Sequence, residues 1–116
     1  MLGLDEFTMD AVGRSNLAIS MGKGFRITFA NGWAVSVQFG PGNYCNNKYV
    51  LGWPDTKRST IDVFRHAGEN GSPNAEIAII GPGGGFHRPR GWTDDVLGYV
   101  APDEILKWMR YAARQK

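Results

Sequence analysis

The chain has 116 residues but only one cysteine, Cys45. A single cysteine cannot form an internal disulfide or a cysteine-based zinc cluster, which fits a reducing compartment. No stretch reaches the roughly 18 consecutive apolar residues that a membrane-spanning helix needs. The first ten residues carry Asp5, Glu6 and Asp10, where a secretory signal peptide would carry lysine or arginine. We therefore expect a soluble, cytoplasmic protein that is neither exported nor bound to a membrane.

The sequence also lacks a strong excess of either charge, because its formal net charge is +2. The charge is uneven along the chain: −2 over residues 1–22, +4 over 23–66, −4 over 67–104 and +4 over 105–116. Proteins that bind nucleic acid usually carry a stronger and more continuous basic surface. A nucleic-acid-binding accessory protein is therefore an alternative rather than the first hypothesis.

No pattern typical of a catalytic or cofactor site is present. The glycine-rich segment 81–85 lacks the Gly-Lys-Ser/Thr of a phosphate loop, and the Phe-His-Arg-Pro that follows it cannot begin a helix. The two histidines and Cys45 lie about 20 residues apart, without the short spacing of metal ligands. Asp94 and Asp95 would face opposite ways on an extended chain, and aspartate is also common in turns. We expect no metal, no cofactor and no catalysis.

A β-hairpin is predicted for residues 24–39, because large apolar residues alternate with smaller or polar ones on both sides of Asn31-Gly32. Asn-Gly is typical of a two-residue type I′ turn, in which both residues have positive φ. The alternation places seven large apolar residues on one face of the hairpin: Phe25, Ile27, Phe29, Trp33, Val35, Val37 and Phe39.

Further elements follow the hairpin. Strands are predicted at 75–80 and 96–100, with a short strand at 86–88 after the turn at 81–85 and weaker candidates at 49–51 and 60–64. A helix is predicted over 102–114, because proline suits the first helical position and the charges complement the helix dipole. Residues 4–12 could form a short helix.

The order of these elements predicts one α+β domain, a single antiparallel sheet of four to six strands with the C-terminal helix packed on one face. We assign residues 23–116 to this domain and residues 1–22 to an N-terminal extension. One core is expected between sheet and helix, formed by Phe25, Ile27, Phe29, Val35, Val37, Ile77, Ile79, Ile105, Leu106 and Met109.

Two segments are candidate binding sites. Residues 86–92 combine two arginines, a histidine and two aromatic residues in a stretch limited by proline and glycine. Arginine offers a planar fork for phosphate or carboxylate, and tryptophan offers a face for stacking. The alternative is a solvated loop with Trp92 folded onto the core. The loop over 43–58 is likewise either a plug over the sheet or a recognition surface.

Arg88 and Arg90 are the only basic residues within the acidic stretch 67–104, so general solubility explains them poorly. We therefore predict that the two segments form one recognition surface, lined by Tyr44, Trp53, Lys57, Arg58, His87, Arg88, Arg90 and Trp92.

Residues 24–45 resemble short, largely uncharacterised proteins encoded by bacteriophages, prophages and plasmids, through the sequence GFRITFANGWAVSVQFGPGNYC. Residues 75–78 and 95–99, followed by the helix at Pro102, resemble the same proteins in the same order, so that the resemblance spans roughly 23–114. It supplies no established activity and no site residue. It implies a setting, since small accessory proteins of phages often act stoichiometrically on host enzymes, on defence systems or on their nucleotide messengers.

We therefore expect a non-catalytic accessory protein of a phage or other mobile element that binds and inhibits a host factor in the host cytoplasm. A defence-system inhibitor would fit, either anti-CRISPR-like or sequestering a nucleotide messenger. The partner would be a host protein or a small anionic ligand such as a nucleotide, and a homodimer is compatible with the sequence. Alternatives are a nucleic-acid-binding protein, whose affinity should fall steeply with salt, and a small enzyme, which should turn over a substrate.

Overall fold

The computed structural model describes residues 15–20, 23–48 and 71–116. The predicted helix at 4–12 and the predicted strands at 49–51 and 60–64 lie outside these described residues.

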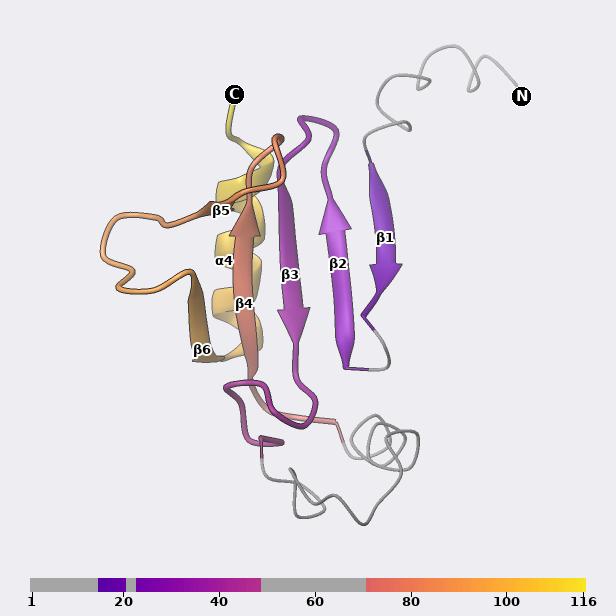
Figure 1. The fold of residues 1–116 in the computed structure, drawn as a ribbon, viewed down its shortest axis with the longest axis vertical. Coiled ribbons are helices and arrows are strands. Elements are labelled where there is room, and N and C mark those ends of the chain that lie inside the picture. The colour runs from indigo at the N-terminus through magenta and orange to yellow at the C-terminus, as the bar shows by residue number, and fades with distance from the viewer. Residues whose placement is uncertain (1–14, 21–22, 49–70) are drawn as a thin grey trace, which may run out of the picture.

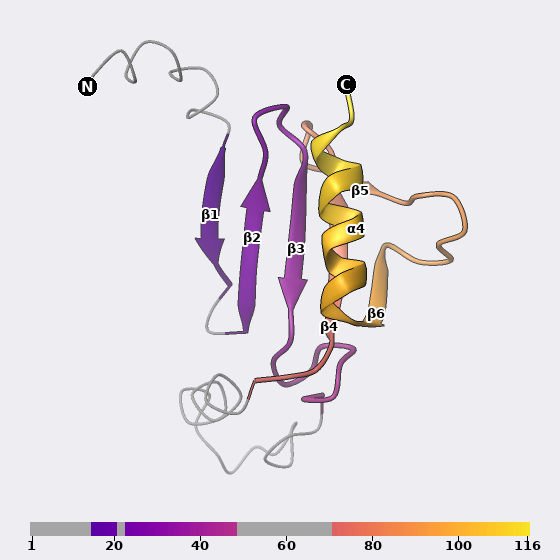
Figure 2. The same cartoon turned by 180° about the vertical axis from the view of Figure 1, so that it is seen from behind.

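Six strands form one antiparallel sheet in the order β1-β2-β3-β4-β5, and β6 also pairs with β4 (Figure 1). The helix α4 lies across one face of this sheet, over β3 and β4 (Figure 2). The predicted α+β fold is thus confirmed, with the helix on one face. The elements are β1 (Asn16–Ile19), β2 (Gly24–Thr28), β3 (Ala34–Gln38), β4 (Ala75–Ile80), β5 (Phe86–His87), β6 (Val96–Val100) and α4 (Pro102–Ala113).

Strand β1 is an edge strand that the sequence does not predict. It pairs with β2, so that Leu17 lies opposite Ile27 and Ile19 lies opposite Phe25. The segment has only four strand residues between polar and glycine-rich flanks, which is shorter than a typical strand. Pairing with the neighbouring hairpin, rather than local sequence, therefore explains why this part of the first 22 residues joins the sheet.

The predicted hairpin of β2 and β3 is confirmed, but the predicted type I′ turn is wrong. The N–H of Gly32 donates to the carbonyl of Phe29, and the N–H of Phe29 donates to the carbonyl of Trp33, both at 2.8 Å. Within this turn only Gly32 has a positive φ, 89°. The connection is therefore a longer turn that ends in a left-handed glycine, the next most common way to close a hairpin.

Asn31 in this turn binds the C-terminal end of α4. Its Nδ2 lies 2.9 Å from the carbonyl oxygen of Ala112, 3.2 Å from that of Ala113 and 2.7 Å from that of Gln115. Its Oδ1 accepts a hydrogen bond from the N–H of Trp33 at 3.0 Å. The last carbonyls of a helix have no partner within the helix. The Asn31 amide therefore supplies a donor to carbonyls at and just beyond the end of α4, of which that of Ala112 also accepts the N–H of Gln115 at 3.2 Å.

Replacing Asn31 with Ala should lower the free energy of unfolding by about 1–2 kcal/mol, because the carbonyls at the end of the helix lose the side-chain amide that donates to them. Asn31→Asp should cost at least as much, since its carboxylate keeps the acceptor for Trp33 but places negative charge at a helix C-terminus. Urea unfolding of both variants measures this. Two unfolding midpoints equal to that of the wild type would show that the contact contributes nothing.

The core lies between the sheet and α4, around the fully buried side chains of Val35, Ile77 and Ile79. The alternation of these strands turns one face toward the helix, as predicted, and all seven large apolar residues of the hairpin pack in or against this cluster. Nine of the ten predicted core residues belong to it. The prediction is wrong for Leu106, which is 49% exposed.

Candidate functional site

The predicted site segment forms a loop that interrupts one edge of the sheet. His87 of β5 pairs with Ile79 of β4, and Val96 of β6 pairs with Ala78, the next residue along β4. Strands β5 and β6 therefore lie end to end along the same edge of β4. The residues between them, 88–95, extend away from the sheet and are called the excursion loop here (Figure 1).

An ion pair closes the base of the excursion loop. The Nε–H of Arg88 donates to Oδ1 of Asp95 at 2.9 Å, and this hydrogen bond raises the pKa of the guanidinium. Oδ1 of Asp94 accepts the backbone N–H of Asp95 at 2.7 Å. The two aspartates thus have structural roles in the turn, as the sequence suggests. Arg88 also has a structural role, whereas Arg90 is exposed on the loop without an ion-pair partner among the described residues.

His87 and Trp92 pack toward the helix rather than lying fully in solvent. The Nε2 of His87 and the hydroxyl of Tyr111 lie 2.7 Å apart, and the rings of His87 and Trp33 meet in a T-shaped arrangement with their centroids 4.9 Å apart. Trp92 meets Trp108 edge to face at 5.2 Å. The indole N–H groups of Trp33, Trp92 and Trp108 are buried without an acceptor in the described part of the chain, so these three side chains contribute to the aromatic cluster through ring packing.

Tyr44 lies at the other end of β6. Its carbonyl accepts the N–H of Tyr99 at 2.8 Å, and a Cβ added at Gly98 would come within 2.7 Å of the Tyr44 Cβ. Tyr99 can offer this donor because it has a φ of 56° and sits in an irregularity of the pairing between β4 and β6. The Lys48 ammonium lies 4.1 Å from the centre of the Tyr44 ring.

The five predicted site residues that the structure describes therefore occupy different places. His87 and Trp92 belong to the aromatic cluster, Arg88 closes the excursion loop, Arg90 is exposed on it, and Tyr44 lies against β6. Trp53, Lys57 and Arg58 lie outside the described residues.

The loop after β3 is held by buried polar side chains. Asn43 donates to Oε1 of Glu76 at 2.9 Å, and Asn47 donates to the carbonyls of Phe39 and Gly71 at 2.8 and 2.7 Å. Cys45 is buried among them, and burial raises the pKa of its thiol. A thiol held in its neutral form is a poor nucleophile, so this loop and its cysteine have the features of a structural segment.

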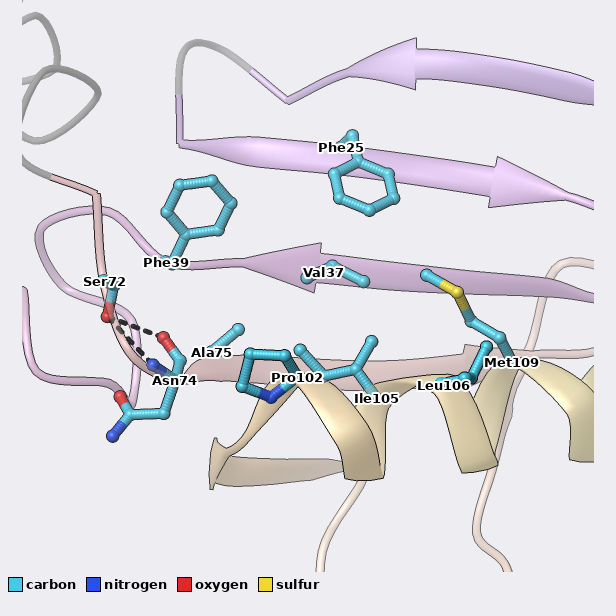
Figure 3. A pocket seen from close by; sticks show the side chains of 10 residues that line it. All are labelled: Phe25, Val37, Phe39, Ser72, Asn74, Ala75, Pro102, Ile105, Leu106 and Met109. Atoms are coloured by element: carbon cyan, nitrogen blue, oxygen red, sulfur yellow. Dashed lines mark hydrogen bonds between the residues drawn. The ribbon is translucent and has the colours of Figure 1, made fainter.

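An apolar groove beside α4 is a feature that the sequence does not predict. A cavity of about 320 Å³ opens between the helix and strands β2 and β3, and the side chains of both layers point into it (Figure 3). The sheet contributes mostly apolar side chains, and α4 contributes four. The lining residues are Phe25, Val37, Phe39, Ser72, Asn74, Ala75, Pro102, Ile105, Leu106 and Met109.

The groove continues across the sheet face next to it. Leu17 and Ile19 lie on the same face as Phe25 and Ile27, their partners across the ladder, and are 72% and 85% exposed. Helix α4 packs on β3 and β4, and no described helix covers this face of β1 (Figure 2). We define the apolar groove as the cavity together with Leu17 and Ile19. Two features of the sequence are compatible with this groove. Leu17 and Ile19 alternate with Asn16 and Ala18 in β1, and Leu106 lies beside the residues of α4 that face the core.

The described residues contain no cluster of three side chains that could hold a metal ion. In the same part of the chain, no helix has the length and apolarity required to cross a membrane. No family model, no curated protein and no solved structure matches the chain. The resemblance of residues 23–114 to phage-encoded proteins therefore stays a prediction.

Proposed function

We propose that this chain is a non-catalytic binding protein that docks onto a host protein through its apolar groove and thereby inhibits it. The observation that carries the proposal is the groove itself, an apolar cavity continuous with exposed leucine and isoleucine side chains on one sheet face. Contiguous exposed apolar surface is unfavourable in water and marks interaction sites on soluble proteins.

The apolar lining of the groove supports a protein partner rather than a small polar ligand. Its walls are apolar along most of their length, and the two polar side chains that line it, Ser72 and Asn74, lie at one end. The Ser72 hydroxyl donates to the backbone carbonyl of Asn74 and accepts its N–H, and the Asn74 side chain hydrogen-bonds to Asn46. Apolar anchors that enter such a concave, water-excluding surface typically supply most of the energy of a protein interface. Leu106 at its rim is therefore the residue whose replacement tests the proposal.

The resemblance to phage-encoded proteins supports the rest of the proposal. On the basis of this resemblance, we propose that the protein belongs to a phage or other mobile element and acts in the host cytoplasm on a defence system. Stoichiometric inhibition would distinguish it from an enzyme, because a binding protein must be present in amounts equal to its target.

Affinity capture from host lysate is the direct experiment. The wild-type chain should retain one host protein in equal amount, and inhibition of that protein should saturate at one chain per target. Recovery of nucleic acid, with binding that falls steeply with salt, would instead favour the nucleic-acid alternative.

A second candidate function, sequestration of a small anionic ligand such as a nucleotide, is favoured by Arg90. Its exposed guanidinium is carried on a loop that is closed by Arg88 and Asp95 and braced by Trp92 against Trp108. The Arg90 guanidinium, exposed on this closed loop, could form charge-assisted hydrogen bonds to a phosphate group.

The double replacement of Arg88 and Arg90 with Ala separates the two functions. If a nucleotide is the ligand, its affinity should fall more than tenfold, measured by calorimetry with the nucleotide recovered from lysate. If a host protein binds at the groove, its affinity should not change. In either case the free energy of unfolding should fall by less than about 1 kcal/mol, because the Arg88–Asp95 pair is accessible to solvent.

A further inference from the structure

The uncovered part of the sheet has the width of one helix. Helix α4 lies over β3 and β4, which leaves the same face of β1 and β2 uncovered by any described helix (Figure 2). Neighbouring strands lie about 4.8 Å apart, so two strands offer a floor about 10 Å wide. An α-helix with its side chains is about 10 Å across. A helix laid beside α4 would therefore complete the layer that α4 begins.

The side of α4 that faces this floor carries a stripe suited to a neighbouring helix. Pro102, Leu106, Met109 and Ala113 are spaced by four, three and four residues, which places them in a row along one side of the helix. The same spacing forms the contact seam between paired helices. The first three of these residues line the cavity, and Leu106 and Ala113 are exposed.

The outer rim of the groove is basic. Arg110 and Arg114 follow the apolar stripe on its solvent side near the C-terminal end of α4, and both are exposed. Asp103 is the one acidic residue on the same outer side, and it lies in the first turn. The opposite rim, at β1, carries no charged residue between Ser15 and Ser20. A helix in the groove would therefore be favoured by acidic residues on the flank that faces α4.

We propose that the apolar groove binds an amphipathic helix of the host protein, with its apolar face on β1 and β2 and an acidic flank toward Arg110 and Arg114. This inference rests on the proposed function and names the partner element. Helix-in-groove recognition uses the same physics as the packing of α4 itself, namely apolar side chains spaced at three and four residues against a complementary surface.

A second copy of this chain fits the groove less well. If α4 of another copy lay on β1 and β2 while still covering its own sheet, it would turn its outer face to Leu17 and Ile19. That outer face carries Asp103, Lys107, Arg110 and Arg114. Burying these charges against leucine and isoleucine would be costly, so the complementary occupant is a different helix.

A pair of synthetic helical peptides tests the inference on the full-length chain. Both are 18 residues long and share one leucine face; one carries glutamate along one flank, and the other carries lysine at the same positions. The glutamate peptide should bind at least tenfold more tightly by fluorescence anisotropy, and Leu106→Glu should abolish its binding. Arg110→Ala with Arg114→Ala should reduce the preference for glutamate at least threefold. Lys107→Ala should not, because the Lys107 ammonium lies 5.1 Å from the centre of the Trp108 ring, on the side of α4 away from β1.

Equal affinity for the two peptides, or affinity that Leu106→Glu leaves unchanged, would overturn the inference. The inference would also be overturned if the glutamate peptide bound only to a full-length variant in which Asp5, Glu6 and Asp10 are replaced by Lys. That result would mean that the chain's own acidic N-terminal segment occupies the groove in the wild type and excludes the peptide. A dimer that Leu106→Glu dissociates would assign the groove to a second copy instead. If Leu106→Glu abolishes capture of the host protein although neither peptide binds, the proposed function stands and the helical partner does not.

Discussion

Ile77→Ala should lower the free energy of unfolding by about 2–5 kcal/mol, the cost typical of truncating a fully buried isoleucine. Ile77 is fully buried on β4, where it pairs with Val37 of β3 on one side and with Leu97 of β6 on the other. Removing its side chain leaves a cavity in the core between the sheet and α4, where the surrounding side chains cannot fully close it. For a domain of ordinary stability this is a large share of the total.

Chemical denaturation of Ile77→Ala, Ile77→Val and Ile27→Ala measures the effect. Ile77→Val should cost only about 0.5–1.5 kcal/mol, because it removes a single methylene. Ile27 is only partly buried, next to the uncovered side of the sheet, so Ile27→Ala should cost less than Ile77→Ala. Equal losses for the two alanine variants would contradict the placement of the core under α4.

Leu106→Glu should weaken binding of the captured host protein at least thirtyfold, which corresponds to about 2 kcal/mol. The replacement puts a carboxylate at the rim of an apolar cavity, where a bound partner would have to desolvate it. Because Leu106 is half exposed in the chain alone, the free energy of unfolding should change by less than about 1 kcal/mol.

Lys107→Glu is the matched control for this replacement. It introduces the same side chain one residue further along α4, on the outer face of the helix, and should leave binding within about threefold of the wild type. Affinity is measured by calorimetry and folding by circular dichroism. Equal losses for both variants would mean that charge on α4, and not the groove, determines binding.

Local patterns were sufficient to predict most of the fold. Alternation over residues 24–39 predicts both strands and the buried face of the hairpin, because the side-chain period of a strand is two. The apolar run at Ala75–Ile80 predicts a central strand, and β4 does pair on both sides. Pro102 and the charge pattern after it predict the start and extent of α4, which begins at that residue.

The features that the sequence does not predict depend on contacts between distant residues. Asn31 binds carbonyls more than 80 positions away, so no local pattern could show that its amide ends the helix. Strand β1 forms because its backbone pairs with that of β2. Leu106 lies next to the residues of α4 that face the core. It lines a groove because the sheet extends beyond α4 on that side, which no local pattern in the helix can show.

The predicted recognition residues illustrate the same limit. Charge alone makes Arg88 and Arg90 look equivalent, but Arg88 lies opposite Asp95 at the base of the excursion loop and Arg90 does not. Trp92 packs against Trp108, which is the second of the two arrangements that the sequence allows for it. Composition can identify a segment rich in binding residues, but the direction of each side chain depends on how the loop is closed.

Methyl NMR of the chain with the captured host protein tests most directly whether the groove is the binding surface. On addition of the partner, the methyl signals of Leu17, Ile19, Leu106 and Met109 should shift or broaden, because these side chains line or flank the groove. The methyl signals of Val96 and Leu97, next to the excursion loop on the opposite edge of the sheet, should stay unchanged. Shifts confined to Val96, Leu97 and the excursion loop would contradict the groove as the site of binding.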